Sequence, residues 1–126
     1  MEWKIHHVAV IASDLAASRR FYVDLLGLPV LRETYRAARD SWKIDLQLAG
    51  GAQLELFTMP SPPPRVTGPE ACGLRHLSFC VEDVPAAVDW LRQRGIACEP
   101  VRVDEVSGGR FTFFFDPDGL PLELHE

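Results

Sequence analysis

The sequence HVAVIASD at residues 7–14 recurs in altered form as HLSFCVED at residues 76–83. In both copies a histidine precedes an apolar run, and an aspartate follows seven residues after the histidine. Leu-Glu-Leu then occurs at residues 54–56 and again at residues 122–124, so that 48 residues separate His from Glu in the first copy and 47 in the second. Motifs that recur in one order at matching spacing indicate an internal repeat, here two copies of a unit of about 50–55 residues.

Each copy is predicted to fold in the order β-α-β-β-β. The apolar runs after the two histidines read as strands. Asp14 and Asp83 suit helix N-caps, and Gly27 and Gly95 suit the positions just after the helices. The remaining strands are expected at residues 30–35, 44–48 and 53–57 in the first copy and at residues 97–103, 111–115 and 122–125 in the second.

The two copies are expected to form one domain over residues 1–126. Module 1 covers residues 1–59 and module 2 covers residues 71–126. Residues 60–70 contain five prolines and are predicted to be an extended linker. The predicted fold class is α+β, with two tandem βαβββ modules.

Composition excludes several classes of protein. The chain is 47% hydrophobic and 25% charged, as in ordinary globular domains. A net charge of -5 argues against nucleic acid as a partner, because phosphate binding needs concentrated Lys and Arg. No apolar run approaches the roughly 20 residues that span a bilayer, and the first residues do not resemble a signal peptide. We therefore expect a cytoplasmic protein that binds neither nucleic acid nor membrane.

Alternation of side chains along a strand separates ionisable residues from large apolar ones. The leucines that flank Glu55 and Glu123 point away from the glutamate, and the histidines lie on the face opposite the bulky residues that follow them. If the two sheets face each other, two imidazoles and two carboxylates line one cavity. That donor set suits one divalent ion per site, Ni, Co, Zn, Mn or Fe. The predicted metal ligands are His7, Glu55, His76 and Glu123.

Each of these residues alone has a simpler explanation. A histidine on a strand is usually structural, and Leu-Glu-Leu is typical of an edge strand with one face in solvent. The joint pattern favours the metal site, because a repeat that preserved only a scaffold would share glycines and apolar residues rather than two ionisable types. His6 competes with His7, but the interval from His7 to Asp14 reproduces that from His76 to Asp83.

On these residues the chain resembles the vicinal oxygen chelate superfamily of glyoxalase I, bleomycin resistance and dioxygenase proteins. It is most similar to the short bacterial glyoxalase I-like proteins within that superfamily. The similarity extends over nearly the whole chain and is strongest at residues 7–15, 21–28, 54–56, 73–79 and 116–124. It implies paired βαβββ modules that form a half-barrel-like metal cavity.

The resemblance also implies roles for the four ligands. Glu123 would be the main proton-transfer group, and Glu55 a ligand and candidate second base. The implied activity is that of a metal-dependent lyase or isomerase, similar to lactoylglutathione lyase. Its small-molecule substrate would be a thiohemiacetal or related α-hydroxycarbonyl that reacts through a metal-bound enediolate. Modules of this superfamily commonly pair between subunits, so a homodimer is expected, with His7 and Glu55 of one chain meeting His76 and Glu123 of its partner.

Other functions within the superfamily stay open. Glutathione-dependent glyoxalases carry an Arg and an Asn where this chain has Ile11 and Met59, so glutathione dependence is undecided. Alternatives are a binding or resistance protein that sequesters a small molecule, or another metal-dependent enzyme such as a dioxygenase or thiol transferase. The ligand set favours the lyase, because sequestration needs no Lewis acid. Candidate substrate-binding residues, each equally explicable as a solvated surface cation, are Arg36, Arg39, Lys43 and Arg110.

Overall fold

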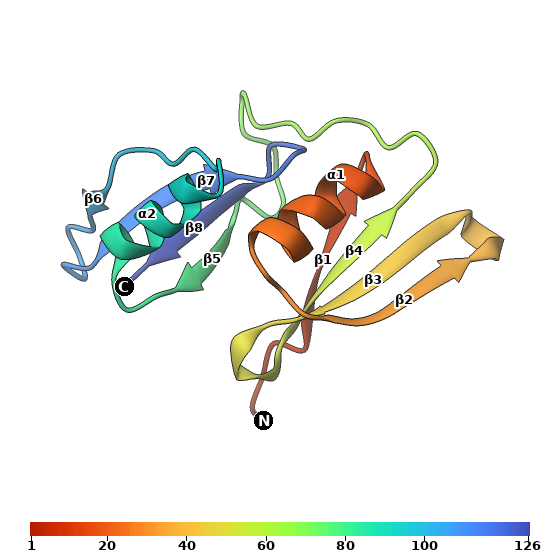
Figure 1. Cartoon of the computed structure of the whole chain (residues 1–126), viewed down its shortest axis with the longest axis horizontal. Helices are drawn as coiled ribbons and strands as arrows, with labels where there is room; N and C mark the ends of the chain where they lie inside the picture. Colours follow the sequence, from red (N-terminus) through yellow and green to blue (C-terminus); the bar gives the residue numbers. More distant parts are fainter. The chain divides into compact units, whose positions relative to one another are not determined.

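The computed structural model describes all residues from Met1 to Glu126 and divides them into two compact units, Met1–Pro64 and Arg65–Glu126. Each unit contains a helix and one four-stranded sheet (Figure 1). The predicted α+β class and the two βαβββ modules are confirmed. The boundary between the units falls within the proline-rich stretch at residues 60–70.

In the first unit the strands pair in the order β1-β4-β3-β2. Strands β1 and β4 are parallel, and the other two pairings are antiparallel. The elements are β1 (His7–Ala12), α1 (Leu15–Arg19), the π-helical turn η1 (Arg20–Leu25), β2 (Val30–Arg36), the 3-10 turn η2 (Ala37–Arg39), β3 (Ser41–Gln47), the 3-10 turn η3 (Ala49–Gly51) and β4 (Gln53–Thr58).

The second unit repeats this topology with the strand order β5-β8-β7-β6. Its first and last strands are again parallel neighbours, and the other pairings are antiparallel. The elements are β5 (Leu77–Cys80), α2 (Val84–Gln93), β6 (Arg102–Val103), β7 (Arg110–Phe115) and β8 (Pro121–His125).

Both helices start at the predicted aspartates. Asp14 Oδ1 accepts a hydrogen bond from Ala17 N at 3.1 Å, and Asp83 Oδ1 accepts one from Ala86 N at 3.0 Å. Each carboxylate satisfies a backbone N–H that has no partner within the helix, as an N-cap does. In both units the helix lies against one face of the sheet (Figure 1), which leaves the other face for a site.

The buried core of each unit lies between helix and sheet. Leu54 and Leu56 of β4 are fully buried, as is Leu122 of β8. Burial of each such side chain stabilises the fold by about 1.5–3 kcal/mol. Because side chains alternate along a strand, Glu55 and Glu123 project from the opposite face, as the sequence predicts.

The strand expected at residues 97–103 is much shorter in the structure. Only Arg102–Val103 pairs with β7 as a strand. Pro100 has no N–H to donate to a ladder, and Thr112 Oγ1 instead donates to the carbonyl oxygen of Glu99 at 2.8 Å. The prediction of a full strand here was wrong, and the irregular segment lies beside the cleft described below.

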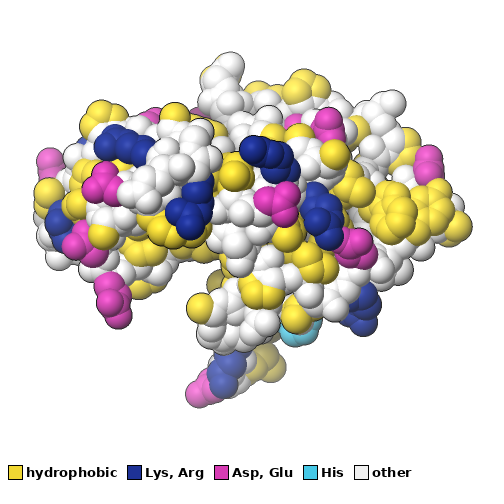
Figure 2. Space-filling view, viewed as in Figure 1, with side chains coloured by type: hydrophobic (Ala, Val, Ile, Leu, Met, Phe, Trp, Pro, Cys, Tyr) yellow, Lys and Arg dark blue, Asp and Glu magenta, His cyan; other side chains and the backbone are white.

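The surface carries both signs of charge. On the face drawn in Figure 2, Lys and Arg side chains alternate with Asp and Glu side chains rather than gathering into one basic patch. None of the helices combines the length and the apolar character needed to cross a bilayer.

Candidate metal centre

The first unit brings His7 and Glu55 together on the open face of its sheet. Ala9 lies opposite Glu55 in the parallel β1–β4 pairing, so His7 stands two residues earlier on the same face. His7 Nε2 is 3.6 Å from Glu55 Oε2. The histidine side chain is 42% exposed and the glutamate side chain 8%, so the pair has one accessible member and one nearly buried member.

Glu55 is also held by a charged network from the neighbouring strands. The Lys43 ammonium lies 3.1 Å from Glu55 Oε1 and 3.2 Å from Asp45 Oδ1. Lys43 and Asp45 form an ion pair rather than a hydrogen bond, because Asp45 Oδ1 accepts no hydrogen bond. Arg32 Nε donates to the other oxygen of Asp45 at 3.1 Å. Lys43 therefore bridges two carboxylates that lie opposite each other on β3 and β4.

The network sets the protonation states of its members. Hydrogen bonding to Glu55 raises the pKa of Lys43 above its usual value. Burial by itself would raise the pKa of Asp45, but the nearby cations of Arg32 and Lys43 outweigh it and hold this pKa below its usual value. At neutral pH both groups are charged.

The second unit brings His76 and Glu123 together in the same way. His76 Nε2 is 3.2 Å from Glu123 Oε2. Ser78 lies opposite Glu123 in the parallel β5–β8 pairing, so His76 again stands two residues before the partner of the glutamate. The His76 ring meets the Phe113 ring nearly edge-on, with centroids 5.2 Å apart. Glu123 forms no ion pair with Lys or Arg.

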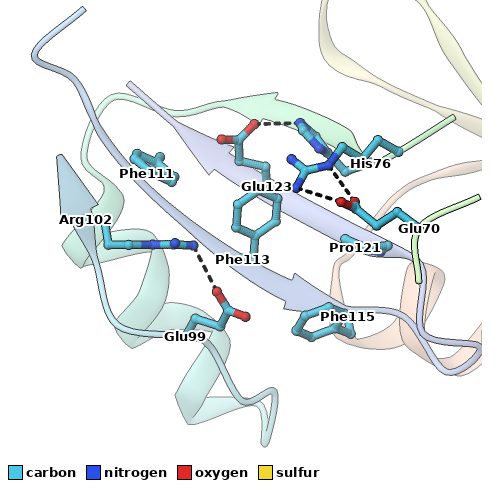
Figure 3. A pocket seen from close by; sticks show the side chains of 10 residues that line it. Glu70, His76, Glu99, Arg102, Phe111, Phe113, Phe115, Pro121 and Glu123 are labelled. Carbon is cyan, nitrogen blue, oxygen red and sulfur yellow. Dashed lines mark hydrogen bonds and ion pairs between the residues drawn. The ribbon is translucent and has the colours of Figure 1, made fainter. Parts of the chain in front are cut away.

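A cleft of about 500 Å³ opens beside His76 and Glu123. Three phenylalanines of β7 line it, with two ion pairs, Glu70–Arg75 and Glu99–Arg102, at its sides (Figure 3). The full lining is Glu70, Arg75, His76, Glu99, Arg102, Phe111, Phe113, Phe115, Pro121 and Glu123.

The surroundings of the two pairs differ in chemical character. Asp45 lies opposite Glu55 in the first sheet, whereas Phe113 lies opposite Glu123 in the second. Two residues away on the same face, the first sheet has Lys43 and the second has Phe111. The first pair is therefore set among charges and the second among aromatic rings.

The donor atoms fit a divalent metal. Imidazole nitrogen with carboxylate oxygen suits the borderline ions Ni, Co and Zn as well as Mn and Fe. Glu55 presents Oε2 to His7 while Lys43 holds Oε1, so that one oxygen remains for coordination. No group of three or more His, Cys, Asp or Glu side chains is assembled for a metal in the structure. Each unit supplies one imidazole and one carboxylate.

The weaker substrate-binding candidates occupy varied positions. The Arg36 guanidinium lies 5.6 Å from the centre of the Phe57 ring, and Arg39 lies exposed in η2. Lys43 is engaged by the two carboxylates described above. Arg110 Nη2 lies 2.5 Å from Glu126 Oε1, and Arg110 is not part of the cleft. Its guanidinium pairs with a carboxylate, and a substrate role for Arg110 stays a prediction.

The sequence reading missed the residues that surround the two His–Glu pairs. Asp45 and Arg32 belong to the network around Glu55, and Arg75 and Arg102 line the cleft. A signal was present for the aromatic floor, because Phe111, Phe113 and Phe115 alternate along one strand and share one face. Arg102 offered no such signal, since its position depends on the irregular segment before β6.

A family model confirms the resemblance stated above. The chain matches the Glyoxalase/Bleomycin resistance protein/Dioxygenase superfamily over residues 4–124, and it belongs to that family. An uncharacterised Escherichia coli (strain K12) protein, YaeR, is 56% identical over 98% of this chain and 95% of its own length. The crystal structure of a glyoxalase family protein from Enterococcus faecalis is 51% identical, with a TM-score of 0.92 over 98% of this chain and 97% of that one.

Two more distant relatives have named activities. Metallothiol transferase FosB of Staphylococcus saprophyticus is 27% identical over 96% of this chain and 75% of its own length. The trypanothione-dependent glyoxalase I of Leishmania major is 25% identical, with a TM-score of 0.74 over 99% of this chain and 87% of that one. The family therefore includes enzymes of more than one reaction class.

Proposed function

We propose that this chain is a metal-dependent lyase or isomerase of the glyoxalase I type. One divalent ion per site, Ni, Co, Zn, Mn or Fe, is held by His7, Glu55, His76 and Glu123. The substrate is a thiohemiacetal or a related small α-hydroxycarbonyl compound. The enzyme is cytoplasmic and works as a homodimer.

One observation carries this proposal. In both units a histidine just before or at the start of the first strand lies within 4 Å of a glutamate on the last strand, at 3.6 Å and 3.2 Å. A pair that served only the stability of one sheet would have no reason to recur at the same register in the other. Two matching half-sites of imidazole and carboxylate are what a mixed nitrogen and oxygen coordination shell requires.

The chemistry divides between the two glutamates. When bound, the ion supplies Lewis acidity that stabilises negative charge developing on the substrate oxygens. Glu123, which forms no ion pair with Lys or Arg, removes the proton from the substrate carbon and returns it to the neighbouring carbon. Glu55 is tied to Lys43 and acts mainly as a ligand.

Two relatives favour this class of reaction. The Leishmania major protein is named as a glyoxalase I, and FosB as a metallothiol transferase, so both names link this fold to a thiol or to a metal. Thiol transfer is therefore the second candidate. It shares the metal site but makes a new bond to a thiol instead of moving a proton within one substrate.

The first test is the metal content of protein purified without chelator, measured by elemental analysis. We expect one divalent ion per site, lost in His7→Ala and in His76→Ala. His125→Ala is the matched control, because it removes an imidazole outside the proposed ligand set and should leave the metal bound. Retention of tight metal by either ligand variant would show that the site is assigned wrongly.

The second test is turnover of the methylglyoxal–glutathione thiohemiacetal by protein loaded with Ni, Co or Zn. Conversion that depends on the metal supports the lyase. Metallated protein that binds this compound without converting it would instead favour sequestration. Activity only with a separate thiol and an electrophile would favour thiol transfer.

A further inference from the structure

The cleft of the second unit has a continuous aromatic floor. Phe111, Phe113 and Phe115 alternate along β7 and line the cleft, while Thr112 and Phe114 are buried on the opposite face. The Phe111 and Phe113 rings meet edge-on, with centroids 6.2 Å apart. Three exposed or half-exposed aromatic rings on one sheet face form a surface on which a flat apolar body can pack.

A guanidinium lies above this floor. The carbon at the centre of the Arg102 guanidinium is 5.0 Å from the Phe111 ring centre and 5.7 Å from that of Phe113. Figure 3 shows Arg102 beside these two rings, with Glu99 as its neighbour. Contact with the rings holds the planar cation in place, so an incoming anion meets a positioned arginine.

The bond that Arg102 makes to Glu99 leaves most of its hydrogen-bonding capacity free. Arg102 Nη2 donates to Glu99 Oε2 at 3.0 Å, one of the five donors that a guanidinium offers. The two side chains are 52% and 42% exposed, so the ion pair is a weak surface interaction. Arg75, the other arginine of the cleft, makes two contacts with Glu70, at 2.6 Å and 3.4 Å, and is the less available cation.

The register places Arg102 at a useful distance from Glu123. Arg102 pairs with Phe111 on β7, and Phe113 of β7 pairs with Glu123 on β8. Neighbouring strands are about 4.8 Å apart and two residues along a strand span about 6.8 Å, so the backbone of Arg102 lies about 12 Å from that of Glu123 across β7. A ligand can therefore have one end at Glu123 and the other at Arg102, with its middle over Phe111 and Phe113.

We infer that the substrate carries a flat apolar group with an anionic group at its far end. The anion, a carboxylate or a group of similar charge, binds Arg102, and the apolar body packs on Phe111 and Phe113. The end that reacts lies at His76 and Glu123. This inference rests on the proposed function only for the reacting end, because the cleft and its cation are defined without a metal.

The first unit supports this assignment by contrast. Its positions equivalent to Phe113 and Phe111 are Asp45 and Lys43. The Lys43 ammonium contacts both Asp45 and Glu55, and Arg32 pairs with Asp45. At these two positions the first unit has charges where the second has aromatic rings, and Phe57, on the same face, lies under the Lys43 ammonium. Recognition of the apolar body is therefore assigned to the second unit.

The test uses 2-naphthoate as the probe and neutral 2-naphthamide as its matched control, with the full-length chain in the presence of chelator. Chelation prevents a metal from binding the carboxylate, and the probe has no vicinal oxygens. Affinity is measured by NMR titration, which also reports whether shifts occur at Arg102, Phe111 and Phe113. We expect naphthoate to bind about tenfold more tightly than naphthamide, as a charge-assisted hydrogen bond allows.

Two variants should move this preference in opposite directions. Arg102→Gln should abolish the preference for the acid and leave naphthamide binding unchanged. Glu99→Gln removes a competing carboxylate and should tighten naphthoate binding about twofold to fivefold, the scale of a surface ion pair. Arg92→Gln, at an exposed position on α2 outside the cleft, is the control and should change neither affinity.

The apolar floor is tested separately with Phe113→Leu, which should weaken both probes because it removes a flat ring. Equal affinity of acid and amide, an acid preference that survives Arg102→Gln, or no saturable binding of naphthoate would each overturn the inference. Failure of the metal site would not change these results. If naphthoate does not bind, the measured metal content and turnover of the metal-loaded protein are unaffected, so the two proposals fail independently.

Discussion

The Lys43 ammonium lies 3.1 Å from Glu55 Oε1, and this contact distinguishes Glu55 from Glu123, its counterpart in the second unit. Glu123 has His76 as its ion-pair partner and forms no pair with Lys or Arg. Lys43 occupies one oxygen of Glu55, whereas no ammonium or guanidinium pairs with Glu123. The repeat therefore supplies two glutamates of the same type in different surroundings, and we propose different chemical tasks for them.

The first prediction concerns these tasks. Glu123→Gln should lower the rate of proton transfer by about 10²–10⁴, the usual effect of losing a general base. Metal affinity should fall only moderately, because the amide keeps one oxygen. The rate is measured as proton exchange or turnover, with metal occupancy determined for each variant.

Glu55→Gln is the matched control for that experiment, because it makes the same change at the equivalent strand position. It should reduce the rate less than Glu123→Gln does. A fully metallated Glu123→Gln protein that works as fast as the parent would contradict the proposed mechanism and favour sequestration.

The second prediction concerns Lys43 itself. Lys43→Met leaves Asp45 and Glu55 adjacent and nearly buried with less cationic compensation, so the free energy of unfolding at pH 7 should fall by about 1–3 kcal/mol. The pKa of Asp45 is lowered in the folded state, so its stabilising contribution is present above its unfolded pKa and is lost as the pH falls. The cost of Lys43→Met should therefore shrink as the pH falls below about 4.

Denaturant unfolding at several pH values measures this effect. Lys4→Met is the control, because Lys4 pairs only with exposed Glu2 at 3.8 Å. A cost at pH 7 no larger than that of Lys4→Met would show that the network around Glu55 contributes nothing to stability.

The third prediction concerns Glu126, which joins helix α2 to strand β7. Its carboxylate accepts hydrogen bonds from Val84 N at 3.0 Å and from Arg110 N at 3.1 Å, and Arg110 Nε donates to it at 2.9 Å. Bonding to the Arg110 side chain lowers the pKa of Glu126 to about 2. A lowered pKa stabilises the fold above the unfolded value near 4.5, and that stabilisation is lost as the pH falls toward 2.

Glu126→Gln should therefore lower the thermal midpoint at pH 7, and the difference from the parent should narrow between pH 4.5 and pH 2. Thermal unfolding followed by circular dichroism measures both. Glu105→Gln changes an exposed glutamate of the same unit and should have little effect at any pH. A difference for Glu126→Gln that stays constant with pH would refute the assigned role.

The fourth prediction is that the protein is a homodimer whose metal sites combine His7 and Glu55 of one chain with His76 and Glu123 of its partner. Light scattering should give twice the 14.1 kDa chain mass. If His7→Ala and His76→Ala chains are unfolded together and refolded at equal amounts, mixed dimers should recover about a quarter of the metal sites. Recovery of none would mean that each chain completes its own site.

Sequence alone predicted the parts of this protein that depend on local pattern and on repetition. The N-cap roles of Asp14 and Asp83 follow from short-range hydrogen bonding, and the confirmed βαβββ order follows from the period of the apolar residues. The proximity of His7 to Glu55, 3.6 Å in the structure, was predicted because the same residue types recur at matching spacing as His76 and Glu123.

The missed features depend on contacts across strands and on irregular backbone. Lys43 meets Glu55 diagonally across the β3–β4 pairing, and this register cannot be read from charge alone. The strand expected at residues 97–103 was predicted too long, because Pro100 has no N–H for the ladder and only Arg102–Val103 pairs with β7 as a strand. The ion pair of Arg110 with Glu126 was missed because the two residues are distant in sequence and close in the fold.

The aromatic strand β7 has a consequence for how this protein can change over time. Phe111, Phe113 and Phe115 belong to the floor of the cleft, whereas the four proposed ligands are contributed by other segments of the chain. Substitutions at Phe111 and Phe115 can alter which compound is accepted without changing a side chain that contacts His76, whereas the Phe113 ring lies against His76. Substrate specificity can thus change through substitutions on β7 while the proposed metal ligands stay the same.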